Sequence, residues 1–340
     1  MMSMSRHAPA MASVIIAALV GAASVSRAQE PTEATAAQEQ EIVSLATIVG
    51  AALQGQDVPT DEPFFWTNDF LKSSEQTTFV PFTLAVAQSK VNTPTAAMYI
   101  YVTPQDAQAA AVAENTLPEA VFEDAYHVNL GAPSTDGNYE IHRGFFAPSG
   151  DYDVYVALSE SAAPAGTEAK TMMLKQAVSV PNLWSDELVT SSVILASRIE
   201  ELTVPLPPDQ ALANPYTLGT KRVVPKLNGK YFTNDELSLL FIVYNAGTAT
   251  TGFPDVNVEY SFSTRLPAGD EFFNKTAPQV FNDSTLPPEF SLTEGWQLVA
   301  GQDIPLSAFA AADYRLEITV TDNTNGRTLI RNVDFSVSES

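Results

Sequence analysis

Few residues in this chain have the types and spacing that nucleophilic or acid–base chemistry requires. The chain has 3 histidines, and two of them, His127 and His142, lie beyond the apolar N-terminal segment. A Ser-His-Asp triad needs a histidine held between nucleophile and acid, and the Gly-x-Ser-x-Gly turn that exposes a hydrolase serine is absent. We interpret both histidines as surface or edge-strand side chains. The sequence therefore predicts no catalytic residue and a protein that is not an enzyme.

Metal-binding and phosphate-binding patterns are also missing from the sequence. There is no cysteine, which excludes disulfides and thiolate metal sites, and two separated histidines fall short of the ligand set of a zinc site. No glycine-rich phosphate loop occurs. The segment from Asp322 to Gly326 offers oxygen ligands but misses the register of an EF-hand loop, and its composition is typical of a turn. We expect neither a metal ion nor a cofactor.

Aromatic side chains are the remaining candidates for contact with a ligand. A flat ring can stack on the face of a sugar, so Trp66, Trp184 and Trp296 are candidate ligand-facing residues, although large aromatic residues also fill cores. The 40 acidic residues could include the carboxylate pair of a glycoside hydrolase, but no pair is singled out by its sequence context.

The N-terminus has the pattern of a secretory signal peptide. Arg6 precedes an apolar, alanine-rich run from Pro9 to Val25, and Ser26-Arg27-Ala28 places small residues where a signal peptidase reads them. We predict cleavage after Ala28, because the run is shorter than the roughly 20 residues of a membrane-spanning helix. An exported protein without cysteine fits a bacterial periplasm or cell exterior, and after cleavage we expect no membrane span.

The charge of the chain restricts its partners. The formal net charge is -23, from 17 basic and 40 acidic residues. Such a surface repels nucleic acid and anionic membranes. The expected partner is therefore an envelope or secreted protein, or a glycan.

Hydrophobic periodicity divides the rest of the chain. Apolar residues between Ile42 and Leu53 recur at helical spacing and predict one short helix over about 39 to 54. After Pro59, runs of aromatic and β-branched residues are separated by Pro, Gly, Asn and Asp, which is typical of β-sandwiches. The proline-rich segment from Val204 to Pro208 reads as a stiff linker. We expect a signal peptide (1–28), an acidic leader with the helix (29–58) and two β-sandwich domains (59–204 and 205–340).

Two predicted strands echo each other. Asp151 to Leu158 and Asp313 to Val320 both read Asp-Tyr followed by alternate aliphatic residues, with the tyrosine and the aliphatic residues on one face. The opposite face is polar in the second copy and mixed in the first. The echo suggests two related sandwiches, and the segment from Glu236 to Asn245, apolar on both faces, predicts a strand buried on both sides.

Several segments, taken in order, resemble a known class of protein. They are Phe145–Val156 (FFAPSGDYDVYV), Ala177–Leu183 (AVSVPNL), Leu188–Ala196 (LVTSSVILA), Tyr231–Leu237 (YFTNDEL) and Phe241–Asn245 (FIVYN). This order resembles the β-rich C-terminal region of exported bacterial, acidobacterial-type proteins related to von Willebrand factor A-domain proteins, over roughly residues 140 to 337. The A domain with its Asp-x-Ser-x-Ser metal motif is absent. The resemblance implies an envelope or extracellular accessory protein without metal-dependent adhesion.

Together these patterns predict a mainly β protein with two immunoglobulin-like or prealbumin-like β-sandwich domains and a short N-terminal helix. Fold alone does not choose a function. The favoured hypothesis is a non-enzymatic binding or scaffolding component of the bacterial envelope or exterior. The alternatives are a carbohydrate-binding module protein and a secreted hydrolase with an unrecognised acidic pair.

Overall fold

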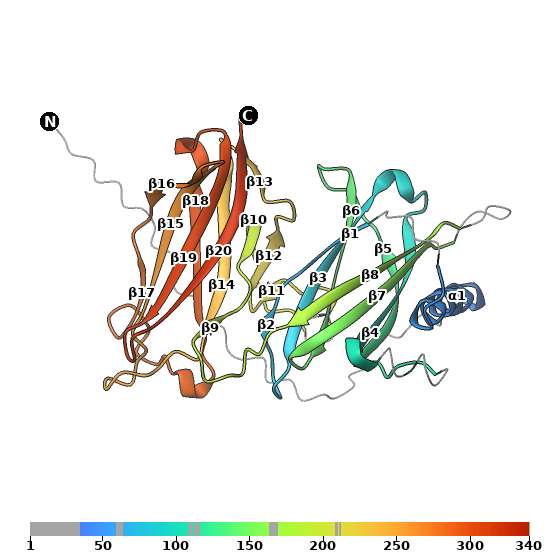
Figure 1. The fold of residues 1–340 in the computed structure, drawn as a ribbon, viewed down its shortest axis with the longest axis horizontal. Coiled ribbons are helices and arrows are strands. Elements are labelled where there is room, and N and C mark those ends of the chain that lie inside the picture. Colours follow the sequence, from blue (N-terminus) through green and yellow to red (C-terminus); the bar gives the residue numbers. More distant parts are fainter. Residues whose placement is uncertain are drawn as a thin grey trace. The chain divides into compact units, whose positions relative to one another are not determined.

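The computed structural model describes residues 35–58, 64–107, 111, 116–162, 169–207, 210 and 212–339. The chain is mainly β with a short N-terminal helix (Figure 1), as its sequence pattern predicts. The predicted signal peptide lies outside the described residues. The chain divides into two compact units, which we call the first and second sandwich. Of the described residues, the first comprises those up to Ser185 with those of Leu202–Thr220, and the second comprises those of Asp186–Glu201 and from Lys221 onward.

The first sandwich begins with a helix and continues with the strands of two sheets. They are α1 (Ala36–Leu53), β1 (Phe64–Asn68), β2 (Leu71–Lys72), β3 (Thr78–Ala87), β4 (Thr95–Pro104), β5 (Phe122–Asn129), β6 (Asn138–Ala147), β7 (Gly150–Glu160) and β8 (Thr171–Val180), with the 3-10 helix η1 (Gln88–Lys90). In one sheet β3 pairs with β1, β2 and β6, and the other sheet has the order β5-β4-β7-β8. The sheets enclose a core of alternate apolar residues, such as Phe82 of β3 and Ile100 of β4.

The second sandwich repeats this arrangement. Its strands are β9 (Val189–Thr190), β10 (Ile194–Glu201), β12 (Lys221–Pro225), β13 (Lys230–Phe232), β14 (Glu236–Tyr244), β15 (Val256–Leu266), β16 (Gly269–Lys275), β17 (Gln279–Phe281), β18 (Leu298–Pro305), β19 (Ala312–Asp322) and β20 (Arg327–Ser338). The 3-10 helices η3 (Leu292–Glu294) and η4 (Leu306–Ala308) also belong to this sandwich, whereas the short strand β11 (Thr217–Leu218) lies in the segment assigned to the first. In one sheet β14 pairs with β9, β10 and β18, and in the other β15 and β19 are central, in the order β13-β20-β19-β15-β16.

The order of strands is the same in both sandwiches. The order β5-β4-β7-β8 corresponds to β16-β15-β19-β20, and the pairing of β3 with β1 and β6 corresponds to that of β14 with β10 and β18. The two echoed strands, β7 and β19, hold the same place in this order. The expectation of two β-sandwich domains of one type is therefore confirmed at the level of topology.

A tyrosine hydrogen bond recurs at the start of each echoed strand. The hydroxyl of Tyr152 donates to the carbonyl oxygen of Pro148 at 3.0 Å, and that of Tyr314 donates to the carbonyl oxygen of Ala310 at 2.9 Å. Both rings are buried. A tyrosine that bonds to the backbone a few residues upstream, where the chain enters a central strand, is the tyrosine corner of immunoglobulin-like sandwiches. The conserved spacing explains why the Asp-Tyr pattern appears twice in the sequence.

The predicted boundary after Val204 differs from the structure. The predicted first domain, 59–204, includes residues 194–201, but these form β10, in which Ile194 pairs with Leu240 of β14 in the second sandwich. The proline-rich segment instead returns to the first sandwich, where Tyr216 is buried. The proline-rich segment was a poor guide to the domain boundary, because prolines indicate a stiff segment, whereas the pairing of strands depends on residues far apart in the chain.

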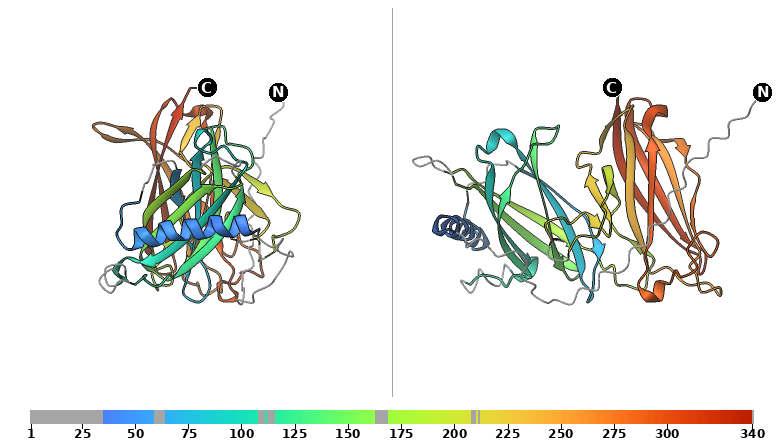
Figure 2. Two further views of the ribbon diagram at one scale, coloured as in Figure 1. Left: turned by 90° about the vertical axis from the view of Figure 1, so that its right-hand side faces the viewer. Right: turned by 180° about the vertical axis from the view of Figure 1, so that it is seen from behind.

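Helix α1 covers the outer face of the β5-β4-β7-β8 sheet. Figure 2 shows the helix lying across the strands. Its stripe of Leu45, Val49 and Leu53 is buried against outward-facing residues of the sheet, among them Tyr99 and Tyr155. The helix begins with a capping box in which the backbone nitrogen of Gln38 donates to the Thr35 hydroxyl while the Gln38 side chain accepts from the Thr35 nitrogen. The outer face of β7 therefore carries both polar and apolar residues because α1 packs against the apolar ones.

Candidate functional site

The first candidate tryptophan, Trp66, belongs to a core. It is 9% exposed and its ring stacks on Phe82 with 4.3 Å between ring centroids. Its indole nitrogen donates to the side-chain oxygen of Asn68 at 2.9 Å. Because the ring is buried, it offers no platform to a ligand, and the ligand-facing interpretation of Trp66 is not supported.

The other two tryptophans are more accessible but separately placed. Trp184 is 37% exposed, its indole nitrogen donates to the carbonyl oxygen of Thr77, and the Lys72 ammonium lies 4.3 Å from the ring centroid. Trp296 is half-buried against the core of the second sandwich, with its ring edge-on to Phe290. Trp184 thus contacts residues of the first sandwich and Trp296 residues of the second.

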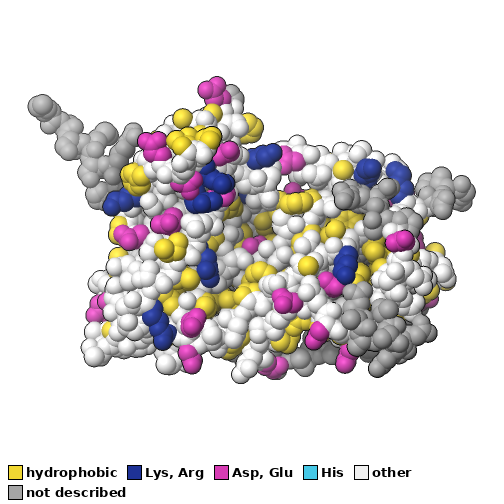
Figure 3. Space-filling model, viewed as in Figure 1, with side chains coloured by type: hydrophobic (Ala, Val, Ile, Leu, Met, Phe, Trp, Pro, Cys, Tyr) yellow, Lys and Arg dark blue, Asp and Glu magenta, His cyan; other side chains and the backbone are white. Residues whose placement is uncertain are grey.

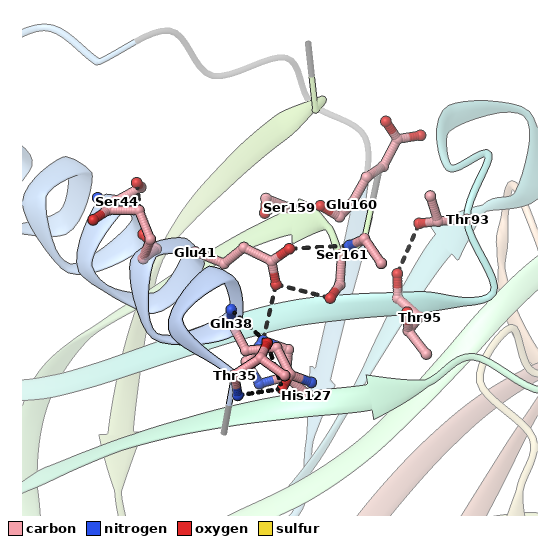
Figure 4. A network of polar contacts seen from close by, with 12 residues as sticks. Thr35, Gln38, Glu41, Ser44, Thr93, Thr95, His127, Ser159, Glu160 and Ser161 are labelled. Carbon is pink, nitrogen blue, oxygen red and sulfur yellow. Dashed lines mark hydrogen bonds and ion pairs between the residues drawn. The ribbon is translucent and has the colours of Figure 1, made fainter. Parts of the chain in front are cut away.

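A serine, a histidine and a carboxylate meet at the N-terminal end of α1 (Figure 4). The same oxygen of Glu41 lies 2.9 Å from the Nε2 atom of His127 and 2.8 Å from the hydroxyl of Ser161, and its other oxygen accepts from the backbone nitrogen of Ala162. The serine hydroxyl therefore donates to the carboxylate, whereas a nucleophile would donate to the histidine. Burial alone would raise the pKa of Glu41, but hydrogen bonds from Ala162, Ser161 and His127 outweigh burial and lower it.

This network anchors a helix. Glu41 comes from α1, His127 from β5, and Ser161 and Ala162 follow β7 (Figure 4). Its carboxylate thus joins the first turns of the helix to two strands of the sheet that the helix covers. His127, expected at the surface or on an edge strand, lies on the edge strand β5 with its side chain 23% exposed.

The second histidine lies on the edge strand β6, in a polar cluster of the first sandwich. The Nδ1 atom of His142 lies 2.8 Å from the Thr83 hydroxyl, and the ring is edge-on to that of Tyr216. The Tyr216 hydroxyl in turn donates to Asp69 at 3.1 Å. Burial, with a contribution from the neighbouring Arg143, lowers the pKa of His142 to about 4. A neutral imidazole at physiological pH helps hold the 202–220 segment on the sheet.

The outer side of the β16-β15-β19-β20 sheet carries the most accessible candidate site, and we call it the open face. It corresponds to the face that α1 covers in the first sandwich. One row of paired residues crosses it, in which Ser263 of β15 pairs with Phe272 of β16 and with Arg315 of β19, and Arg315 pairs with Asp334 of β20. Paired residues share a face of a sheet. Phe272 is 63% exposed.

Four charged side chains form a connected network beside Phe272. Asp334 accepts hydrogen bonds from the Nε and Nη2 atoms of Arg315 at 2.8 and 3.0 Å, and from Arg265 at 2.8 Å. Arg315 also donates to Asp270 at 3.1 Å. Hydrogen bonds from Arg315 are the main cause of the lowered pKa of Asp334. In Figure 3 basic and acidic side chains are interspersed over this part of the molecule.

The sequence did not single out the open face. Phe272 lies next to Phe273, whose ring packs on Phe309 and Tyr314, so the two rings lie on opposite sides of the sheet, as successive residues of a strand do. Two adjacent phenylalanines do not reveal which ring is exposed, and the Arg–Asp pairs join residues as far apart as Arg265 and Asp334. The sequence feature that could have indicated the open face is the fully polar outer face of β19.

Among the described residues, no group of three or more His, Asp or Glu side chains is placed to hold a metal ion. Within that part of the chain no helix has the length and apolar character needed to cross a bilayer.

Comparison with known proteins gives distant structural similarity alone. No family model and no curated protein matches the chain. Among solved structures, the chain is similar to trypsin-activated alpha-2-macroglobulin from Escherichia coli, with 12% identity and a TM-score of 0.22. It is also similar to Salmonella alpha-2-macroglobulin reacted with methylamine, with 12% identity and a TM-score of 0.20. In both cases the match covers 83% of this chain and 17% of the other chain.

Proposed function

We propose that this protein is an exported, non-enzymatic binding component of the bacterial envelope or exterior, and that it binds through the open face. The observation that carries the proposal is the contrast between equivalent faces of the two sandwiches. In the first, α1 covers the face, whereas in the second the face is accessible and presents Phe272. A large exposed aromatic ring beside an ordered polar network is a common feature of recognition surfaces.

The remaining support comes from the sequence. The signal-peptide pattern and the lack of cysteine favour export from a bacterial cell, and the excess of acidic residues disfavours nucleic acid as the partner. His127 bonds to Glu41 and His142 to Thr83 in networks that hold parts of the first sandwich together, and this structural role favours binding over hydrolysis. The relationship to exported von Willebrand factor A-related proteins stays a prediction from the sequence pattern.

A site-specific cross-linking experiment tests the proposal. A photoreactive phenylalanine analogue replaces Phe272 in the mature protein, which is then irradiated with the envelope and secreted fractions of its host. Phe65, on strand β1 of the first sandwich, is a matched control because it is 56% exposed. We expect a discrete adduct, with protein or with polysaccharide, from position 272 and none at position 65. The same adducts from both positions, or none from 272, would refute the proposal.

A further inference from the structure

The open face has the chemistry of a carbohydrate-binding surface. We infer that its ligand is a neutral glycan, with a sugar ring stacked on Phe272 and its hydroxyl groups bonded to the Arg–Asp network. The inference rests on the proposed function, because it assigns a ligand class to that same face. It is carried by the polarity of the face, by the pairing of its charges and by the position of its aromatic ring.

Covering the open face with a protein would remove its charged side chains from water, which costs free energy. Charged residues are depleted at the centre of protein–protein interfaces, because removing paired charges from water costs more than their attraction returns. Here Arg315 lies on the central strand β19 and Asp334 on its neighbour β20, and they are 32% and 44% exposed. A glycan hydroxyl can donate to a carboxylate and accept from a guanidinium, so it replaces water at these groups without leaving them unpaired.

The equivalent face of the first sandwich shows what a protein element requires. There the outward residues of β7 include Tyr155 and Ala157, and both are buried with α1. Counted from the tyrosine corners, the same positions of β19 are Glu317 and Thr319. A face built to receive an apolar helix is apolar, whereas the open face is polar at matching positions. This contrast favours a hydrophilic ligand.

The geometry places an apolar surface next to hydrogen-bonding groups. Phe272 lies on the edge strand β16, and its neighbour in the row is Ser263, whose side chain is small. The next strand carries Arg315. With strands about 4.8 Å apart, a sugar stacked on the ring extends its hydroxyls over Ser263 and Arg315. A longer glycan continues across β19 to Asp334.

The charges of the face favour a neutral ligand over an acidic one. In the network, Arg265 and Arg315 balance Asp270 and Asp334. Glu317, the next outward residue along β19, adds a negative charge. The excess of acidic residues over the whole chain further opposes a polyanion.

Glycan binding by the mature protein tests the inference. An array of neutral and acidic oligosaccharides identifies ligands, and calorimetry then compares the wild type with Phe272→Ala and Arg315→Lys. Lysine keeps the positive charge but loses the planar fork that bonds Asp334 and Asp270. Phe65→Ala is the control, and the melting temperature of each variant checks its folding.

We expect binding of a neutral oligosaccharide that weakens about tenfold or more in Phe272→Ala and is unchanged in Phe65→Ala. Binding of acidic glycans alone, or equal loss in both alanine variants, would overturn the inference. A protein adduct at position 272 without glycan binding would also overturn it, yet would leave the proposed binding function standing. The absence of any adduct and of any glycan binding would overturn both.

Discussion

The replacement Glu41→Gln tests whether the Glu41 network holds α1 on its sheet. The side chain is 20% exposed and accepts hydrogen bonds from His127, Ser161 and Ala162. Glutamine keeps the shape but loses the charge and turns an amide group toward these donors. Hydrogen bonds to a buried charged group contribute about 1.5 to 3 kcal/mol each, and glutamine retains part of them, so we expect a loss of about 2 kcal/mol in the free energy of unfolding.

The pH dependence makes this prediction specific to the carboxylate. Folding lowers the pKa of Glu41 from its usual value of 4.5. The unfolded chain therefore takes up the proton first as the pH falls, and the stabilisation, complete above 4.5, is lost as the pH falls through the lower folded-state pKa. The difference in free energy of unfolding between the wild type and Glu41→Gln should therefore become smaller as the pH falls below 4.5.

Urea unfolding across this pH range measures the difference, and hydrogen exchange of the α1 amides shows whether the loss is local. Glu39→Gln, which changes an exposed acidic residue in the first turn of α1, controls for charge near the helix N-terminus. A Glu41→Gln difference that stayed constant down to strongly acidic pH, or that Glu39→Gln reproduced, would contradict the assignment of the anchor to the Glu41 carboxylate.

Three further predictions concern the framework. Tyr152→Phe and Tyr314→Phe should each lower the free energy of unfolding by about 1 to 2 kcal/mol, because each leaves a carbonyl oxygen without its donor, and a loss in one sandwich only would argue against equivalent corners. His142 has a pKa near 6.5 in the unfolded chain and about 4 in the folded one, so the unfolded state binds more protons between these pH values. The free energy of unfolding should therefore fall as the pH drops from 6.5 to 4, by at most about 3 kcal/mol. In an acid titration of unfolding, His142→Asn should show a smaller dependence on pH over this range. Gly144→Ala should destabilise the first sandwich by about 1 to 3 kcal/mol in urea unfolding, because a Cβ atom there would lie 2.5 Å from the Phe79 ring; a neutral effect would mean that the ring moves freely.

Local patterns were sufficient for elements that depend on local periodicity. The residue pattern predicts strands over Thr78–Ala87 and Thr171–Val180, which are the bounds of β3 and β8, and the helical stripe from Ile42 to Leu53 lies within α1. β14, with apolar residues on both faces, has buried residues on both sides and lies between β10 and β18. The short or polar strands, such as β16, were missed because edge strands need little apolar alternation.

The sequence by itself determined the class of fold, because the alternation of apolar and polar residues and the turn residues between strands are local features of the sequence. The Asp-Tyr pattern of β7 and β19 also indicated that a strand is repeated. Tertiary structure alone decided that β10 belongs to the second sandwich, that Glu41 meets His127 and Ser161, and that Phe272 is exposed beside Arg315 and Asp334. Each of these depends on strand pairing, or on packing of a helix against a sheet, between segments far apart in the chain, about which the spacing of neighbouring residues carries no information.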